Sequence, residues 1–509
     1  MRILKILFSK TFLVVISFLI QVGILIGVVQ YFNEYFAVFQ VISVVISLIV
    51  FFYLINKKEC IEFKLPWLLI LVVFPYFGML LYVIFYNPKF SKKTEKELRK
   101  NKLIKKSKIK LTEDEEKEIK NELKEQYKIE KYLNNVSLTR GYLNNDTKYL
   151  NSGEEFLKDL IVELRKAKKF IFMEYFIIKP GLMWDSIYNV LLEKVNENVD
   201  VRLIYDDLGS LGYVDNDFCL KLQKVGIKCY KFNPFYPILS GIYNNRDHRK
   251  ITIIDGKIAY TGGINIGDEY INSKSPYGHW KDSAIKIIGP AVKNLTEMFL
   301  EIYNSITKNN EEVDKYINIE FEDKNKKGFV HPFGDGPRPI YQEPIAENNF
   351  INIINNAEKY IYITTPYLII DYNLTTALRN AALKGIDVRI ITPHIPDKKI
   401  IFKITRSNYK YLLEAGVKIY EYTPGFIHQK SLVSDGKIAF IGTINLDYRS
   451  LVHHYECGVV LYNTDSLVDI YNDIKDIIEM SEEITFKNYK MKKIDKLIVL
   501  ILSIFSPLF

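Results

Sequence analysis

Apolar residues are concentrated in three long runs at the start of the chain. The first two runs, Thr11–Val29 and Phe36–Ile55, are separated by Glu34, the only charged side chain between them. The third run, Pro66–Tyr86, carries no charge. Each run is long enough to cross a bilayer as a helix, although a buried core helix is the alternative for any single run. The pattern predicts a membrane anchor of two or three transmembrane helices over residues 1–86.

Beyond residue 136 the pattern changes to helical periods that alternate with short β-branched runs. FLKDLIVELRKAKK has a helical period, FIFMEYFII reads as a strand, and VRLIYDD follows a second helical segment. This alternation is typical of α/β layers around a central sheet. The same order of segments occurs a second time further along the chain. VGIKCYKFNP at 225–234 is matched by AGVKIYEYTP at 415–424, and VDVRLI at 199–204 is matched by IDVRII at 386–391.

The clearest repeat joins HRKITIIDGKIAYTGGIN at 248–265 to HQKSLVSDGKIAFIGTIN at 428–445, an offset of 180 residues. This period is too long for a solenoid and indicates a duplicated domain. We expect two α/β domains, 136–320 and 335–489, joined by a polar, turn-rich segment. A basic linker, 87–135, precedes them, and an apolar tail, 490–509, follows.

Positive charge is concentrated beside the predicted anchor. Residues 87–110 hold eleven basic and two acidic side chains, which equals the net charge of +9 of the whole chain. The positive-inside rule places this segment and the domains after it in the cytoplasm. Three crossings would then leave the basic N-terminus outside, so either a short N-terminal tail is translocated or one run does not span. The segment itself is either a solvated linker or a stripe held on anionic lipid headgroups.

The apolar end of the chain, LIVLILSIFSPLF at 497–509, is too short to span a bilayer and follows three lysines. We expect it to lie at an anionic lipid interface, with a terminal strand or core helix as the alternative.

Composition excludes several classes of protein. A hydrophobic content of 48% excludes a disordered chain. The four cysteines are scattered, without metal-ligand spacing, which argues against a disulfide framework or zinc site and favours a reducing compartment.

Within each repeat, a His and a Lys two residues apart approach an Asp-Gly hairpin turn, so a strand would project both from one face. A Gly-rich turn that carries an Asn follows. Lys supplies a charge for a phosphate oxygen, Asn supplies amide donors, and His can act as nucleophile or as general acid and base. One such motif would be weak evidence for a site. Two copies with identical spacing predict that one phosphodiester is held between two facing sets of His, Lys and Asn side chains. A metal site is disfavoured because the lysines would repel a cation.

These two His-x-Lys-x4-Asp-x6-Gly motifs resemble the phospholipase D superfamily, and most closely its bacterial cardiolipin synthases. Supporting strings are YDDLGS at 205–210, HWKDSAIKIIGPAV at 279–292, TTPYLIID at 364–371 and FIHQKSLVSDGKIAFIGTINLDYRS at 426–450. The resemblance covers essentially the whole chain. Two departures from the usual family pattern fall at one aligned position: Thr443 stands where Ser is usual, which keeps a hydroxyl, and Gly263 stands at the same place in the first motif.

The resemblance implies a fold of two facing phospholipase D-like domains and a reversible, metal-independent phosphatidyl transfer that needs no cofactor. One phosphatidylglycerol would give its phosphatidyl group to a His, and a second would accept it, forming cardiolipin and glycerol. His248 is assigned as nucleophile and His428 as general acid and then base. The remaining implied site residues are the phosphate-binding Lys250, Lys430, Asn265 and Asn445, the motif-organising Asp255 and Asp435, and the His-orienting candidates Asp282 and Glu456.

Three alternatives stay open. A phospholipase D-type hydrolase would use the same chemistry with water as acceptor. A nuclease or other phosphodiesterase is disfavoured because the excess charge lies next to the membrane rather than on the catalytic domains, so we expect no nucleic-acid partner. A non-catalytic membrane scaffold would be expected to have lost at least one His or Lys. The expected partners are phosphatidylglycerol and anionic lipids at a bacterial cell membrane, and the oligomeric state is left open.

Overall fold

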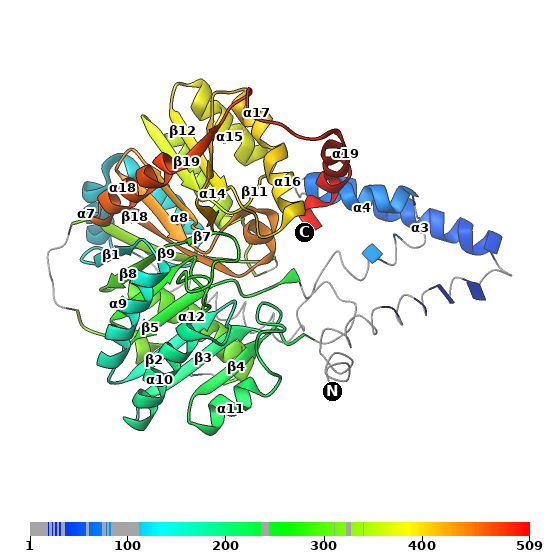
Figure 1. Cartoon of the computed structure of the whole chain (residues 1–509). Coiled ribbons are helices and arrows are strands. Elements are labelled where there is room, and N and C mark those ends of the chain that lie inside the picture. The colour runs from blue at the N-terminus through cyan, green and yellow to red at the C-terminus, as the bar shows by residue number, and fades with distance from the viewer. Residues whose placement is uncertain are drawn as a thin grey trace.

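The computed structural model describes residues 36–57, 61–73, 111–235, 244–309, 311–321, 327–338 and 340–508, with a few further positions among residues 19–31 and 78–82. The described chain forms two α/β halves, one above the other, and the helices near the N-terminus extend to one side (Figure 1). The first apolar run, Thr11–Val29, lies largely outside these residues, and the basic segment 87–110 lies wholly outside them. The predictions made for both segments stay predictions.

The first half is built on a mixed sheet of seven strands in the order β1-β8-β6-β5-β2-β3-β4. Strands β2, β3 and β4 are parallel, and the others are antiparallel to their neighbours. The central strand β2, FIFMEY, is buried along its whole length, as expected of a strand covered on both faces. The strand bounds are Asp146–Leu150 (β1), Phe170–Tyr175 (β2), Asp200–Asp206 (β3), Lys228–Phe232 (β4), Lys250–Ile254 (β5), Ile258–Gly262 (β6) and Ala284–Ile288 (β8).

The second half repeats this topology. Its sheet has the order β19-β13-β12-β10-β15-β16-β18-β9, which reproduces the first sheet and adds β19 at one edge. The sheet starts at Phe329, ahead of the position 335 expected from sequence. The strand bounds are Phe329–Asp335 (β9), Tyr360–Thr364 (β10), Asp387–Pro393 (β12), Lys418–Tyr422 (β13), Ser431–Ser434 (β15), Ile438–Gly442 (β16), Glu456–Tyr462 (β18) and Ser481–Ile484 (β19).

Helices cover the two sheets. In the first half they are α9 (Gly153–Lys166), α10 (Leu182–Asn196), α11 (Phe218–Lys224), α12 (Val292–Thr307) and α13 (Asp314–Ile317). In the second half they are α14 (Ile345–Asn356), α15 (Tyr372–Leu383), α16 (Lys399–Ser407), α17 (Tyr409–Leu413), the π-helix η4 (Arg449–His453) and α18 (Ser466–Glu479). One buried apolar cluster contains side chains of both halves, including Phe172, Phe299, Phe333 and Phe440.

The halves are joined by backbone as well as by side chains. The short strand β7 (His279–Lys281) of the first half pairs in parallel with β14 (Gly425–Ile427) of the second. The ammonium of Lys281 lies 2.5 Å from a carboxylate oxygen of Asp473 in α18, and both side chains are buried. The Tyr149 hydroxyl donates to the same carboxylate at 2.6 Å. Because these contacts cross the boundary, the two halves hold one fixed relative position.

Two helices precede the first half and pack on the second. α7 (Glu113–Leu123) begins with a capping box, in which the Thr112 hydroxyl accepts from the Glu115 amide at 3.2 Å and the Glu115 carboxylate accepts from the Thr112 amide at 2.9 Å. α8 (Tyr127–Val136) follows after the short 3₁₀ helix η2 (Lys124–Gln126). Both helices bury apolar side chains, so this part of the linker predicted over 87–135 belongs to the domain packing.

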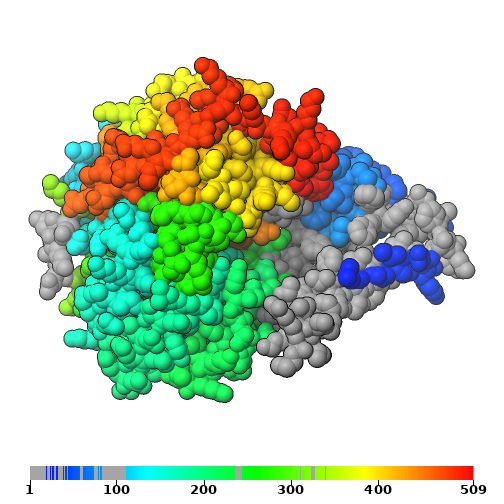
Figure 2. Space-filling model, in the orientation of Figure 1, coloured from blue at the N-terminus to red at the C-terminus, as the bar shows by residue number. Residues whose placement is uncertain are grey.

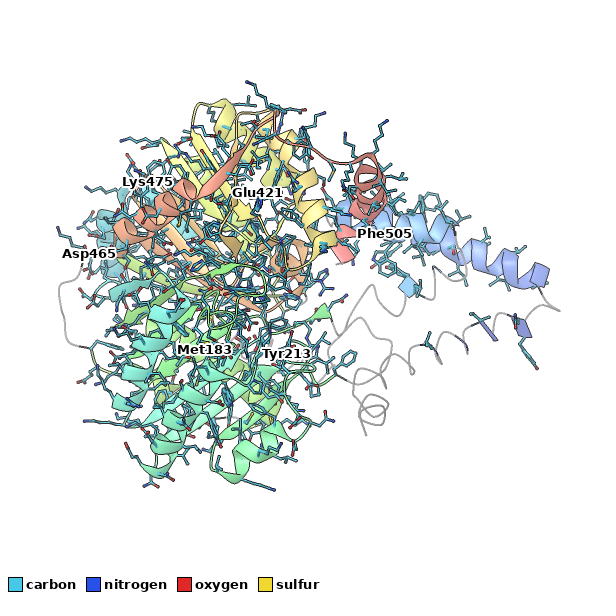
Figure 3. All side chains as sticks on the ribbon, viewed as in Figure 1. Met183, Tyr213, Glu421, Asp465, Lys475 and Phe505 are labelled. Atoms are coloured by element: carbon cyan, nitrogen blue, oxygen red, sulfur yellow. The ribbon has the colours of Figure 1, made fainter. Side chains whose placement is uncertain are left out.

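The second apolar run forms α3 (Phe36–Asn56), and α4 (Ile61–Val73) continues into the start of the third. Within the described part of the chain, no helix meets the combined length and hydropathy that a membrane crossing requires. The C-terminal helices α19 (Lys493–Leu502) and η5 (Ser503–Leu508) pack beside α4. Figure 2 shows this contact between the red and blue ends of the chain, and Figure 3 labels Phe505 within it.

Two of the cysteines that are apart in the sequence are neighbours in the fold. The Sγ atoms of Cys219 in α11 and Cys229 in β4 lie 2.9 Å apart as free thiols. Cys457 in β18 is a free, buried thiol as well.

Candidate active site

Each His-x-Lys-x4-Asp motif leads into a β-hairpin, β5–β6 in the first half and β15–β16 in the second. The first turn residues, Asp255 and Gly256, have φ values of 53° and 66°, as a tight hairpin turn requires. The Asp255 carboxylate accepts from the backbone amides of residues 168–170 at 2.7–2.9 Å. Asp435 accepts in the same way from residues 358–360. Both aspartates therefore fix the loop before the central strand, at the end of the hairpin away from the histidines.

The two motif histidines lie at the boundary between the halves. The backbone amide of His248 donates to the carbonyl of Tyr455 at 2.9 Å, and that of His428 donates to the carbonyl of Lys281 at 2.7 Å. Each histidine is thus bonded to the backbone of the opposite half. Their side chains are buried, with 6% and 8% of the residue exposed.

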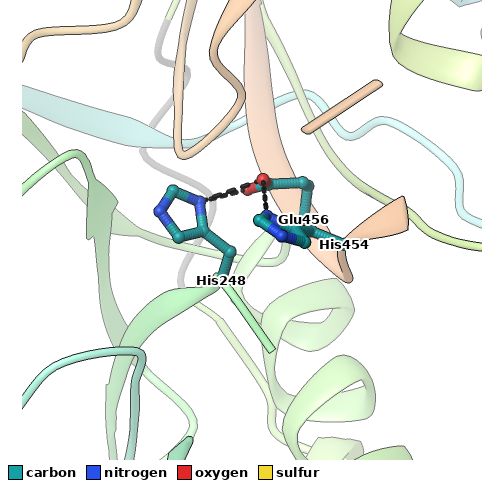
Figure 4. Close-up of side chains that lie close together, drawn as sticks. All are labelled: His248, His454 and Glu456. Atoms are coloured by element: carbon teal, nitrogen blue, oxygen red, sulfur yellow. Dashed lines mark hydrogen bonds and ion pairs between the residues drawn. The ribbon is translucent and has the colours of Figure 1, made fainter. Parts of the chain in front are cut away.

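The carboxylates predicted to orient the histidines also lie in the opposite half from the histidine that each contacts. Nδ1 of His248 lies 3.0 Å from Oε2 of Glu456, the first residue of β18 (Figure 4). Nδ1 of His428 lies 2.7 Å from Oδ2 of Asp282. Both carboxyl groups are fully buried. A carboxylate on Nδ1 holds the proton there and leaves Nε2 with its lone pair, which is the tautomer that a nucleophile or general base needs.

The residues at the aligned position after each hairpin, Gly263 and Thr443, fit these carboxylates. Thr443 donates its hydroxyl hydrogen bond to Oε2 of Glu456, and its oxygen accepts from the Cys457 amide at 3.0 Å. At the equivalent position a Cβ on Gly263 would lie 2.1 Å from Oδ1 of Asp282. Asp282 therefore leaves room only for glycine at residue 263, whereas Glu456 is hydrogen-bonded by the hydroxyl of residue 443.

The motif lysines point into the same buried region. Lys250 donates to the carbonyl of His248 at 2.5 Å, and Lys430 donates to that of His428. Burial lowers the pKa of Lys250 to about 8 and that of Lys430 to about 7. Two ammonium groups that lack sufficient counter-charge in this pocket would be stabilised by an anion bound between them.

The imidazoles also titrate below their ordinary range. Burial, followed by the charge of the motif lysine, lowers the pKa of His248 well below its ordinary value and that of His428 to about 4. The two carboxyls differ. Burial raises the pKa of Glu456 well above its ordinary value. Burial raises the pKa of Asp282 too, but His428 and Lys430 outweigh it, so this pKa is lowered. Both imidazoles are neutral near pH 7 and can act as bases.

The two predicted phosphate-binding asparagines are not equivalent. Oδ1 of Asn265 accepts from the Ile177 amide at 3.0 Å, and its Nδ2 donates to the Tyr270 hydroxyl at 2.7 Å. Asn265 therefore holds the loop after β2. Asn445 donates to the carboxyl of Asp447, and its Oδ1 is buried without a donor.

Sequence reasoning missed a pair of aromatic neighbours. The ring of His454 lies 5.5 Å from that of His248, and the ring of Trp280 lies 5.3 Å from that of His428, measured between centroids. Both residues precede the orienting carboxylate by two positions, so the aligned strings HYE and WKD carry the only sequence signal for them. Both ring nitrogens of His454 are buried without a hydrogen-bond partner.

Ligand atoms of His248, His454 and Glu456 all lie within 4.8 Å of one another, a spacing that a metal ion could use. The surrounding charge argues against a cation. Lys250 lowers the pKa of both histidines, and Arg246 adds to the effect on His454. A site with these positive neighbours favours an anion such as a phosphodiester.

The family described as cardiolipin synthase, PLD-like domain, matches residues 160–303 and 350–479, one segment in each half. A Streptococcus mutans protein described as uncharacterized is 41% identical, covering 90% of this chain and 98% of its own. Cardiolipin synthase 2 of Bacillus cereus is 34% identical and covers 86% of this chain and 84% of its own. The cardiolipin synthase of Alkalihalophilus pseudofirmus is 33% identical and covers 89% of each chain.

Among solved structures, the phosphatidylserine synthase of Haemophilus influenzae superposes with a TM-score of 0.56. The superposition covers 75% of this chain and 98% of that one, at 16% sequence identity. At this identity the likeness shows the fold alone.

Proposed function

The chain belongs to the cardiolipin synthase family of PLD-like proteins and is a phosphatidyltransferase, and we propose that it transfers a phosphatidyl group between two molecules of phosphatidylglycerol. The products are cardiolipin and glycerol. The observation that carries this proposal is the exchange between the halves, in which each motif histidine is oriented by a carboxylate of the other half. The exchange places two neutral imidazoles and two lysines around one boundary, as an in-line displacement at phosphorus needs.

In the first step, Nε2 of His248 attacks phosphorus, and the bond from phosphorus to the glycerol oxygen breaks. His428 gives a proton to that oxygen, and glycerol leaves. In the second step, His428 takes a proton from a hydroxyl of the second phosphatidylglycerol. The hydroxyl oxygen attacks phosphorus, and the phosphohistidine bond breaks. One phosphodiester bond to a glycerol oxygen is broken and one of the same kind is formed. The two sides of the reaction therefore have similar free energies, and the transfer is reversible.

The charges of the site support this sequence of protonation states. His428 must carry a proton to act as an acid, whereas burial and Lys430 hold its pKa at about 4 in the free protein. The negative charge of a bound phosphodiester raises the pKa of both the imidazole and the lysines. Lys250 and Lys430 then stabilise the charge that develops on the phosphoryl oxygens.

The substrate requires a bilayer, and the proposal places the protein at the bacterial cell membrane with its catalytic halves in the cytoplasm. The three apolar runs of the sequence and the basic segment after them support this location. The outer face of α19 supports it as well, because it exposes four apolar side chains: Ile494, Leu497, Leu500 and Ile501. An amphipathic helix with lysines at its start is suited to an anionic lipid interface.

The test uses purified protein in phosphatidylglycerol vesicles without divalent metal, with cardiolipin and released glycerol measured together. Wild type should give equal amounts of both, and His248→Ala and His428→Ala should each remove them. His394→Ala is the control, because His394 is exposed and its imidazole pairs with Glu421, which contacts neither motif histidine. Phosphatidic acid in place of cardiolipin would identify a hydrolase, and no product from wild type would refute the proposal.

A further inference from the structure

The second asparagine of the site has an unused acceptor. Only 5% of Asn445 is exposed, and its Oδ1 has no hydrogen-bond donor. Its amide group donates to the Asp447 carboxyl, so the carbonyl oxygen is the free end. A buried acceptor without a partner costs about 1–3 kcal/mol, and native proteins keep few of them. The equivalent Asn265 is fully bonded, so the unused oxygen is specific to the second half.

An unpaired cation lies four residues further along the chain. Arg449 is exposed, and among the described residues its guanidinium makes no hydrogen bond or ion pair, although its charge acts on the carboxyl of Asp447. By contrast, the buried arginines Arg202 and Arg246 each bind a carboxylate. Arg449 begins η4, a π-helix, and single π-turns occur frequently at functional sites. The same π-helix ends immediately before His454, which packs beside His248.

Asp447 connects the two groups. Its carboxyl accepts from the Asn445 amide and interacts with the charges of Arg449 and Lys398. An unused carbonyl oxygen and a guanidinium without a hydrogen-bond partner therefore flank one half-buried carboxyl in the second half of the fold. The oxygen fits a hydroxyl donor, and the guanidinium fits a phosphodiester.

We infer that Asn445 and Arg449 form the subsite of the accepting lipid, an inference that rests on the proposed function. Oδ1 of Asn445 accepts a hydrogen bond from the glycerol headgroup, and Arg449 binds the phosphodiester that the acceptor itself carries. The ligand class is an alcohol linked to an anionic phosphodiester, which free glycerol and water are not. Held in this way, the second hydroxyl competes with water through its high effective concentration at the phosphohistidine.

The experiment compares acceptors in one reaction. Vesicles of unlabelled phosphatidylglycerol are mixed with radiolabelled free glycerol, and three products are measured. Cardiolipin reports the lipid acceptor, labelled phosphatidylglycerol reports free glycerol, and phosphatidic acid reports water. Arg449→Gln should lower the ratio of cardiolipin to labelled phosphatidylglycerol by about tenfold or more, as expected for the loss of one charge-assisted contact. Arg449→Lys should restore part of the ratio, because lysine keeps the positive charge but lacks the paired N–H donors of the guanidinium.

Two further variants complete the design. Asn445→Leu removes the acceptor oxygen and should shift products toward phosphatidic acid. Arg338→Gln removes an exposed arginine outside the site and should leave the ratio at the wild-type value. An unchanged ratio in Arg449→Gln, or an equal loss of all three products, would overturn the subsite while the synthase activity stands. If wild type makes phosphatidic acid alone, the proposed function fails, and the acceptor subsite fails with it.

Discussion

The carboxylate of Asp282 in the first half accepts a hydrogen bond from Nδ1 of His428 in the second half at 2.7 Å. Glu456 and His248 make the same contact in the opposite direction. Neither motif histidine is therefore paired with a carboxylate of its own half. The duplication has therefore produced one candidate site that depends on the relative position of both halves.

Asp282→Asn should lower the rate of phosphatidyl transfer by about 10³-fold, because an amide can donate to Nδ1 and favour the wrong imidazole tautomer. Turnover in phosphatidylglycerol vesicles measures the effect. Asp465→Asn is the control, since Asp465 is exposed on the surface (Figure 3).

The pairing across the boundary also predicts which double variants are non-additive. Asp282→Asn combined with His428→Ala should be no slower than His428→Ala alone, because the two residues act as a unit. Asp282→Asn combined with Glu456→Gln should be slower than either single variant. A double-mutant cycle that instead couples Asp282 to His248 would contradict the observed pairing.

The two motif copies should differ in what they tolerate after the hairpin. Gly263→Thr should abolish activity and lower the thermal midpoint, since even a Cβ at this position would lie 2.1 Å from Asp282. Thr443→Ser keeps the hydroxyl on Glu456 and should retain most of the activity. Thr443→Val removes that donor and should lower turnover by about tenfold. Circular dichroism melts and vesicle assays separate folding from catalysis, and a fully active Gly263→Thr would refute the steric explanation.

The motif aspartates should behave as structural residues. Asp435→Ala leaves the backbone amides of residues 358–360 without their acceptor and should lower the free energy of unfolding by about 2 kcal/mol or more. Asp255→Ala should act in the same way on residues 168–170. Denaturant titration measures the change. A variant with normal stability and no activity would instead place the aspartate in the chemistry.

Much of this arrangement could be predicted from the sequence, because a duplication repeats local pattern. The paired hairpins, the motif histidines and the lysines follow from spacing alone. The candidates Asp282 and Glu456 followed from their position after each motif, but the histidine that each contacts depends on how the halves pack. Asn265 and Asn445 sit in the same string, IN, and differ only in their neighbours. His454 has no residue of its type at the matching position, where Trp280 stands, so the repeat gave no reason to select it.

The depressed lysine pKa values predict that anion binding takes up protons. Burial sets the pKa of Lys250 at about 8 and that of Lys430 at about 7, against an ordinary value of 10.5. A lysine whose pKa is lowered by folding does not destabilise the fold above its unfolded-state pKa, where it is neutral in both states. The free energy of unfolding falls as the pH drops from about 10.5 toward the folded-state pKa, because only the unfolded chain takes up the proton. An anion between the lysines reverses this effect by raising both values.

Sulfate, which does not titrate in this range, is a suitable probe of that uptake. Near pH 8.5 most of both lysines is neutral in the free protein, so binding should take up about one to two protons. Near pH 5.5 both are already charged, and the lysines should take up almost none. Calorimetry in buffers with different ionisation enthalpies measures the number directly. Lys430→Gln should reduce the uptake at pH 8.5 by about one proton, whereas Lys437→Gln, an exposed lysine at the hairpin turn, should leave it unchanged. Binding without proton uptake at pH 8.5 would show that the lysines stay charged in the free site and that their burial has no effect on the phosphate they are proposed to hold.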